Sequence, residues 1–200
     1  MQLLVATHNA HKTREIQRIL GQKFDVQDLS AHDDAPEIRE SGESFVENAR
    51  LKAVTASRHL PGLVVADDSG LEVDALGGAP GIHSARYAGV DATAQEKIGK
   101  LLDELAKIGA KGERRRARFR CVLALARAGR ILATFEGAVE GKIADRPLGS
   151  HGFGYDPIFV PNGFNETFGE LPEAVKDNIS HRAKAIHELR AKLPALCGEN

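Results

Sequence analysis

Apolar residues recur along the chain in two spacings, and each spacing predicts a type of secondary structure. Residues 2–7 and 63–67 are short, nearly continuous apolar runs, which is typical of buried strands. Residues 116–126 and 131–141 alternate apolar and polar side chains on either side of the sequence RAGR. This alternation predicts a β-hairpin.

Four other segments place apolar residues three and four positions apart, as amphipathic helices do: 12–21, about 44–60, about 94–108 and 179–193. Ser44 and Thr93 each precede a glutamate by three residues and are expected to cap the second and third of these helices. The glycine-rich residues 77–89 and 149–157 are expected to be loops. The order of the elements predicts an α/β fold with a mixed sheet.

Composition narrows the class of protein. The chain has 200 residues, which suits one domain or two tightly joined lobes, and 27 basic against 28 acidic residues, which argues against a broad basic face for nucleic acid. The two cysteines favour a reduced, cytoplasmic protein, with Cys121 expected in the core. No apolar stretch approaches the ~20 residues of a membrane span, and the N-terminus lacks the features of a signal peptide.

Adjacent carboxylates at Asp67 and Asp68 follow the buried run VVA and are the most suggestive polar feature. Ligands of open α/β sheets gather at the carboxyl ends of strands, and side chains alternate along a strand. One aspartate can therefore face a site while the other supports the loop expected at Ser69. Paired carboxylates also suit a hard divalent cation such as Mg²⁺.

Three further clusters have both a functional and an ordinary interpretation. The turn 7–12, THNAHK, is either a capped βα loop or an anion site at a helix N-terminus. Glu37 and Glu40 are either part of a solvated acidic loop or metal ligands. Lys52, with Asn48 one turn before it, is either a surface lysine or a functional one.

Near the C-terminus, residues 153–156, FGYD, precede Lys176 and the pair His181–Arg182. An aromatic ring between glycines can present a flat face to a base, and Arg and His can donate to carbonyl or phosphate oxygens. Phe153 could equally be a plain core residue. The segment 137–143, GAVEGKI, is not a P-loop, because its glycine spacing is short and no Ser or Thr follows the lysine. CxxC, HExxH and GxSxG motifs are absent from the sequence.

Five motifs in order, TxNxxK, ESGESFxENAxxKA, ADDSGLEVDALGGAPGIHSARYAG, FGYDPIF and ISHRxKA, resemble the inosine triphosphate pyrophosphatase family over about residues 3–190. The resemblance implies an elongated mixed sheet flanked by helices, in a single ITPase-like domain (1–200) of two lobes with a nucleotide cleft between them. It also implies a Mg²⁺-dependent, usually homodimeric enzyme. Such an enzyme cleaves ITP, dITP or XTP to the monophosphate and pyrophosphate and removes these nucleotides from the pool.

The resemblance also implies roles for the matched residues. Glu40 and Asp68 would hold the metal, Lys52 would lie near the phosphates, and Ser69 would touch the substrate. The phosphate loop would comprise Thr7, His8, Asn9, Ala10, His11 and Lys12, and the base and sugar would be surrounded by Phe153, Gly154, Tyr155, Asp156, Lys176, His181 and Arg182. Many relatives have a small residue or Gly before the lysine of the phosphate loop, and acidic residues where this chain has Ala174 and Val175.

These assignments predict a mechanism. Asp68 is expected to be the metal ligand and the general base toward water, with Asp67 supporting the loop, although the reverse assignment remains open. Lys12, Lys52 and the metal would neutralise the triphosphate, and Arg182 or His181 would favour a 6-oxo purine over adenine. A nucleotide-binding regulator and a phosphohydrolase of broader specificity are the alternative functions.

Overall fold

The computed structural model describes residues 1–32 and 34–197. Eleven helices and strands, joined in places by short 3₁₀ segments, follow one another along this part of the chain. They are β1 (Gln2–Val5), α1 (Ala10–Leu20), β2 (Asp25–Asp28), α2 (Phe45–His59), β3 (Val64–Val73), α3 (Ala94–Lys107), β4 (Arg116–Arg127), β5 (Arg130–Ile143), β6 (Phe159–Pro161), α4 (Glu173–Ile179) and α5 (His181–Cys197).

The strands form one six-stranded mixed sheet in the order β2-β1-β3-β4-β5-β6. β1 pairs in parallel with β2 and with β3, whereas β5 and β6 are antiparallel. The predicted α/β class with a mixed sheet is therefore confirmed.

The chain divides into two compact units. The first unit comprises residues 1–68, 121–137 and 181–200, and the second comprises residues 69–120 and 138–180. The boundary in β3 falls between Asp68 and Ser69. The expectation of a single domain made of two lobes stays a prediction.

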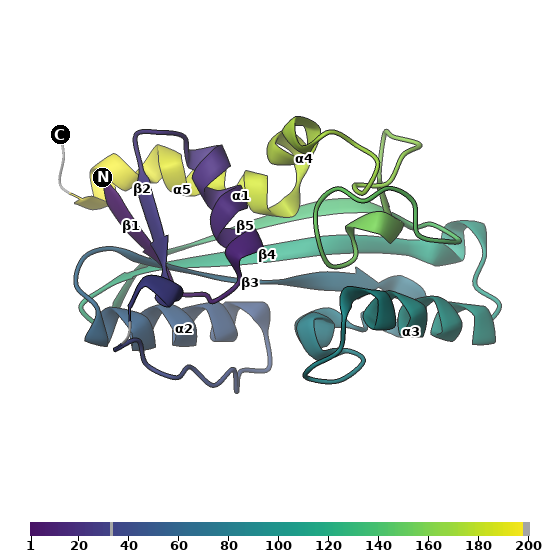
Figure 1. Cartoon of the computed structure of the whole chain (residues 1–200), viewed down its shortest axis with the longest axis horizontal. Helices are drawn as coiled ribbons and strands as arrows, with labels where there is room; N and C mark the ends of the chain where they lie inside the picture. The colour runs from purple at the N-terminus through teal and green to yellow at the C-terminus, as the bar shows by residue number, and fades with distance from the viewer. Residues whose placement is uncertain (33, 198–200) are drawn as a thin grey trace. The chain divides into compact units, whose positions relative to one another are not determined.

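The first unit has its own apolar core. Leu3 and Val5 of β1, Ile16 of α1, Val65 of β3 and Ile186 of α5 are buried together in it. Figure 1 shows α1 and α5 on one side of these strands and α2 on the other. α1 begins at its cap Asn9 and ends at Gly21, whose positive φ of 82° lets the chain turn away.

The second unit is built around a separate core, in which Leu71 of β3, Leu101 of α3 and Val139 of β5 take part. Phe159 lies between the rings of Phe119 and Phe168, with centroid distances of 4.6 and 5.5 Å. Thr93 and Glu96 form the predicted capping box at the start of α3.

Three local predictions differ from the structure. β3 does not end at the aspartates but continues to Val73, because Leu71 and Val73 are buried and extend the alternation that the Ser69–Gly70 pair seemed to interrupt. β2 has one apolar residue among four, so its pattern gave no strand signal. The expected helix 179–193 starts at His181, after the separate short helix α4.

Candidate functional site

The turn between β1 and α1 is a capped βα loop. The side chain of Asn9 accepts a hydrogen bond from the backbone N–H of His11 at 3.0 Å, and Thr7 Oγ1 accepts one from the N–H of Asn9 at 3.1 Å. The side chains of residues 8–11 are exposed. An exposed start of an 11-residue helix carries the positive end of the helix dipole, so the ordinary and the anion-binding interpretations of this turn are compatible.

Lys12 reaches from the first turn of α1 to β3. Its Nζ donates to Asp67 Oδ1 at 2.5 Å and lies 3.4 Å from the Asp67 carbonyl oxygen. The other carboxylate oxygen, Oδ2, accepts from Arg182 Nε at 2.8 Å and from the thiol of Cys121 at 3.2 Å. Burial would raise the pKa of Asp67, but the positive charges of Arg182 and Lys12 outweigh it and hold that pKa well below its usual range.

Asp68 has a different set of neighbours. Lys52 of α2 donates from Nζ to Asp68 Oδ1 and to Glu40 Oε1, each at 2.7 Å. The second oxygen, Asp68 Oδ2, is buried and has no hydrogen-bond partner among the residues that the structure describes. Burial raises the pKa of Asp68, although the charge of Lys52 opposes the shift. Lys52 is itself 7% exposed, so the surface-lysine interpretation is wrong.

The pleat of β3 explains why adjacent aspartates differ so much. Successive side chains of a strand point to opposite faces of the sheet. Asp67 therefore meets Lys12 of α1 and Arg182 of α5, which lie on one side of the strands, and Asp68 meets Lys52 of α2 on the other. Asp67 is surrounded by donors, whereas Asp68 keeps an oxygen that can take a further ligand. This geometry favours Asp68 as the reactive carboxylate.

Arg182 lies inside the first unit. It is 1% exposed, and besides its bond to Asp67 it is ion-paired with Glu15 of α1. Burial would lower the pKa of Arg182, but Asp67 and Glu15 raise it well above its usual value, so the guanidinium stays charged. These contacts favour a structural role for Arg182, and its predicted contact with the base stays a prediction.

His181, the first residue of α5, is 4% exposed. Its carbonyl oxygen lies where a side chain on Gly137 would be, 2.0 Å from a built Cβ position. A glycine in β5 therefore lets α5 begin close against the strand and brings Arg182 to Asp67.

The second unit holds the other predicted cluster. Lys176 of α4 donates to Asp156 Oδ2 at 2.6 Å, and its Nζ lies 4.8 Å from the ring centroid of Phe153. Asp156 Oδ2 also accepts from the backbone N–H of Phe153 at 2.7 Å. A Cβ on Gly152 would lie 2.0 Å from that oxygen, so this position needs glycine. The ring of Phe153 is half-buried rather than a plain core residue.

The remaining members of the second unit are placed as follows. Tyr155 is buried, and its hydroxyl donates to the carbonyl of Ser84 at 3.1 Å. Gly154 has a φ of 62°, which lets the chain turn between Phe153 and Tyr155. Ser69 is half-buried in β3. The structure thus groups the predicted metal and phosphate residues with His181 and Arg182 in the first unit, and the other predicted base and sugar residues with Ser69 in the second.

Comparison with known proteins identifies the chain's relatives. The family model described as the Ham1 family matches residues 3–192. The chain belongs to the Ham1 family. It is 47% identical over 198 residues to the dITP/XTP pyrophosphatase of Geobacillus kaustophilus, covering 98% of this chain and 96% of that protein. It is 46% identical over 193 residues to the dITP/XTP pyrophosphatase of Bacillus subtilis, covering 96% of each.

The fold agrees with that membership. A solved HAM1 protein from Coxiella burnetii superposes with a TM-score of 0.85 at 38% identity, covering 98% of this chain and 99% of that chain. Membership in the Ham1 family and the mixed-sheet fold therefore rest on both sequence and structure. The resemblance inferred from the five motifs is confirmed.

Two buried contacts of this Ham1 chain, those of Glu15 with Arg182 and of Cys121 with Asp67, were not predicted from the motifs. Glu15 lies on the apolar stripe of α1 with Ile19, four residues on, and a carboxylate on such a stripe is a signal for a buried cation. Cys121 was expected in the core and is 1% exposed, but nothing in its apolar surroundings along the sequence indicates that its thiol touches Asp67.

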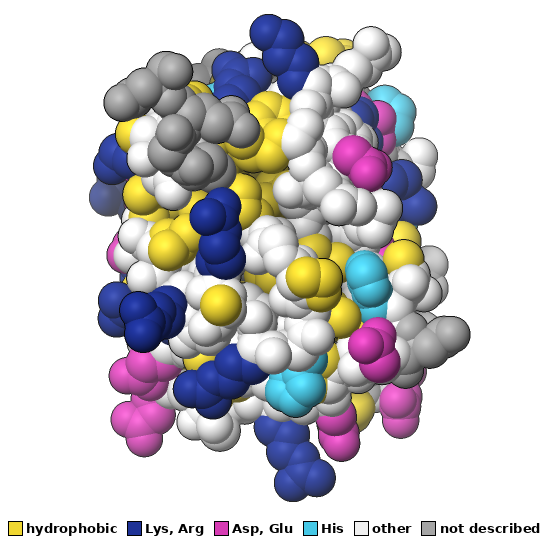
Figure 2. Space-filling view, turned by 90° about the vertical axis from the view of Figure 1, so that its left-hand side faces the viewer, with side chains coloured by type: hydrophobic (Ala, Val, Ile, Leu, Met, Phe, Trp, Pro, Cys, Tyr) yellow, Lys and Arg dark blue, Asp and Glu magenta, His cyan; other side chains and the backbone are white. Residues whose placement is uncertain are grey.

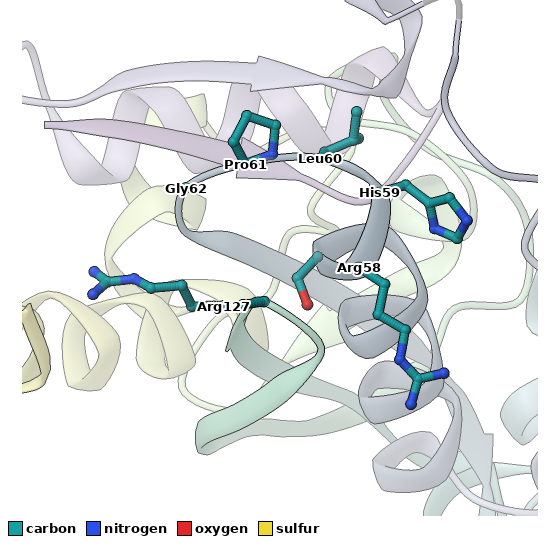
Figure 3. A pocket seen from close by; sticks show the side chains of 8 residues that line it. Arg58, His59, Leu60, Pro61, Gly62 and Arg127 are labelled. Carbon is teal, nitrogen blue, oxygen red and sulfur yellow. The ribbon is translucent and has the colours of Figure 1, made fainter.

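A pocket of about 330 Å³ lies elsewhere in the first unit (Figure 3). It is formed by the last turn of α2, the Leu60–Gly62 loop and the β4–β5 turn, and none of the predicted site residues lines it. The side chains of Arg58 and Arg127 point away from each other, so they do not converge on one ligand. On the face of the molecule in Figure 2, the Lys and Arg side chains of the described residues are scattered among other types rather than joined in one patch.

Among residues 1–32 and 34–197, no three His, Cys, Asp or Glu side chains come together as a group that could hold a metal. In the same part of the chain, no helix has the length and apolar character to cross a bilayer.

Proposed function

We propose that this Ham1 protein hydrolyses the purine nucleoside triphosphates ITP, dITP and XTP to the nucleoside monophosphate and pyrophosphate. Relatives that carry the name dITP/XTP pyrophosphatase match nearly the whole chain. The observation that carries the proposal is the placement of the buried Lys52 between Glu40 and the buried Asp68. Two carboxylates and a lysine held together in this way suit a polyanionic substrate that brings a cation with it.

We assign Mg²⁺ as the cofactor. The unpartnered oxygen of Asp68 and the carboxylate of Glu40, whose side chain is 31% exposed, are hard oxygen donors of the kind Mg²⁺ takes. Mg²⁺ commonly binds through one or two carboxylates together with substrate phosphates and water, so a pair of carboxylates without a third His, Cys, Asp or Glu among the described residues is consistent with it. The ion would supply positive charge against the triphosphate and increase the acidity of a bound water.

We assign the other catalytic roles to side chains of the first unit. Asp68, whose pKa is raised, is the general base that takes the proton of the attacking water, and Lys52 neutralises charge on the phosphates. Lys12, at the start of α1, does the same at the phosphate loop, where the helix dipole adds to its charge. Asp67 is a positioning residue, because it holds the ammonium of Lys12 in place.

We assign recognition of the base and sugar to residues of the second unit. The half-buried ring of Phe153 can stack on a purine, and Lys176 and backbone N–H groups are donors that suit a 6-oxo purine. Adenine presents an amino group at that position, so a donor would face a donor. An unmet buried polar group costs ~1–3 kcal/mol, which gives roughly ten- to hundredfold discrimination.

We further propose a homodimer in the cytoplasm. The proposal of a dimer rests on the family resemblance. The proposal of a cytoplasmic location rests on the small number of cysteines, which is two. Light scattering coupled to size-exclusion chromatography tests the dimer directly: a mass near twice the 21.5 kDa of the chain supports it, and a mass near 21.5 kDa contradicts it.

The test of the function is a Mg²⁺-dependent assay across ITP, dITP, XTP, ATP and GTP that scores pyrophosphate separately from orthophosphate. Pyrophosphate release from the first three, well above ATP and GTP, is the expected result. Comparable turnover of all five would indicate a broader phosphohydrolase, and binding without any release would indicate a regulator.

A further inference from the structure

Lys52 occupies the place between the two carboxylates assigned to the cation. Its ammonium is 2.7 Å from Glu40 and 2.7 Å from Asp68, and its side chain is 9% exposed. The residue projects from α2, whereas Glu40 comes from the preceding loop and Asp68 from β3. One positive group therefore holds three segments of the first unit together.

We propose that Lys52 is an internal counter-cation that competes with divalent metal ions for Glu40 and Asp68. In this proposal the site binds free metal weakly, because a cation held by Glu40 and the unpartnered Oδ2 of Asp68 would lie close to the ammonium of Lys52 and would have to displace it. The proposal rests on the metal site put forward under the proposed function and adds to it a control on when that site is filled.

Electrostatics supports the competition. The two carboxylates repel each other, and the charge of Lys52, which is paired with both, opposes that repulsion. An ammonium and a divalent cation a few ångströms apart repel in turn, most strongly where water is scarce. Lys52 bonds Oδ1 of Asp68, and a metal on the neighbouring Oδ2 and on Glu40 would be repelled by the ammonium until Lys52 moves away.

A released Lys52 needs another anion, and the triphosphate supplies one. Its four-carbon stem is flexible enough to turn the ammonium toward a phosphate without movement of α2. Nucleotide binding would therefore favour the released state of Lys52, and so would metal binding. Two ligands that favour the same state of a residue bind cooperatively, and the coupling is reciprocal.

Lys12 provides a matched control. It is also a partly buried lysine of the first unit that is paired with an aspartate of β3, but its carboxylate partner is Asp67. Among the described residues, it makes no ion pair with Glu40 or Asp68 that would have to break. Removing its charge should change metal affinity far less than removing that of Lys52.

The test is direct titration of Mn²⁺, followed by electron paramagnetic resonance, at neutral pH and without nucleotide. The proteins compared are the wild type, Lys52→Met, Lys52→Arg and Lys12→Met. We expect Lys52→Met to bind Mn²⁺ about tenfold more tightly or better, while Lys52→Arg and Lys12→Met stay within about threefold of the wild type. Equal or weaker binding by Lys52→Met overturns the proposal.

Failure of the proposal can be told from failure of the proposed function. Pyrophosphate release by the wild type together with unchanged Mn²⁺ affinity in Lys52→Met overturns the competition alone. Absence of Mn²⁺ binding by both proteins at millimolar metal overturns the metal site and the competition together.

A second measurement uses the wild-type protein, in case Lys52→Met does not fold. Lysine acylation mapped by mass spectrometry is compared with and without Mg²⁺, with Lys12 as the internal reference. Release of Lys52 from its carboxylates should raise its labelling severalfold and leave Lys12 unchanged. Labelling of Lys52 that does not respond to Mg²⁺ contradicts the proposal.

Discussion

The adjacent substitutions Asp67→Asn and Asp68→Asn in β3 should differ in their effect on stability. Asp67→Asn should lower the stability of the fold, whereas Asp68→Asn should lower activity and leave stability almost unchanged. Asp67 accepts hydrogen bonds from Lys12, Arg182 and Cys121, and its side chain is fully buried. An asparagine would present an amide donor to one of these donors and would remove the charge that compensates Arg182. Breaking a buried ion pair by removing one partner costs about 3–5 kcal/mol.

The cost of Asp67→Asn should lie at the lower end of that range, about 3 kcal/mol, since Arg182 keeps Glu15 and Lys12 is partly exposed. For a chain of this length, 1 kcal/mol corresponds to about 2–4 °C in Tm, so we expect a fall of about 6–12 °C. Asp68→Asn removes a carboxylate whose charged form burial disfavours, and Lys52 retains Glu40. Its stability should stay within about 1 kcal/mol of the wild type.

The activities should not follow the stabilities. Asp68→Asn should abolish pyrophosphate release in a protein that melts almost normally, whereas Asp67→Asn should lose both stability and turnover. Thermal melts followed by circular dichroism and urea titrations give the stabilities, and the pyrophosphate assay gives the activities. Equal destabilisation by the two substitutions, or a thermally neutral Asp67→Asn, would refute the division of roles between the two carboxylates.

The pH dependence of stability supplies a further check with a definite sign. The pKa of Asp67 lies below its ordinary value of 3.8, so its contribution is fully present above about pH 4 and is lost as pH falls through the folded-state pKa. The pKa of Asp68 is raised in the folded protein, so the ionised Asp68 carboxylate destabilises the fold at pH values above that pKa. This destabilisation is lost as the pH falls and the carboxyl becomes protonated. The difference in Tm between the wild type and Asp67→Asn should therefore shrink in acid.

Three backbone predictions can be tested by the same melts. Gly137→Ala places a methyl group 2.0 Å from the His181 carbonyl and should cost more than about 2 kcal/mol, with reduced activity because α5 is displaced. Gly99→Ala, in α3 with open space around it, should stabilise the protein by about 0.5–1 kcal/mol, and a similar loss in both variants would contradict the steric argument. Ala128 has a φ of 49°, so Ala128→Gly should relieve strain and raise Tm by a few degrees, about 1 kcal/mol in stability, and a fall in Tm would contradict it.

Periodicity predicted the elements of the fold because most helices and strands here bury one regular stripe. It failed where burial is decided by partners far away in sequence. Lys52 lies on the buried stripe of α2, three residues after Ala49 and four before Ala56, but its charge indicated an exposed position; it is buried because Glu40 and Asp68 lie opposite it. β3 continues through residues that have the composition of a turn, since Leu71 and Val73 are needed in the second core.

The candidate site was predictable to the extent that its residues form compact motifs. Thr7 to Lys12 and the aspartate pair each stand in one short stretch, so type and spacing indicated their chemistry. The contacts of Arg182 could not be predicted from a local motif. Its expected contact with the base stays a prediction, but its place between two carboxylates, with 1% of the residue exposed, was not expected, because no local pattern carries that information.

The continuity of β3 through the aspartate pair constrains how this segment can change. Because neighbouring positions of a strand face opposite sides, loss or gain of a single residue just before Asp67 would exchange the surroundings of the two acids. The carboxylate that now anchors α1 and α5 would turn toward α2, and the one assigned to catalysis would be enclosed by Arg182. A shift by two residues would leave each aspartate facing the same side of the sheet as before. We therefore expect this segment to tolerate insertions or deletions of two residues better than those of one.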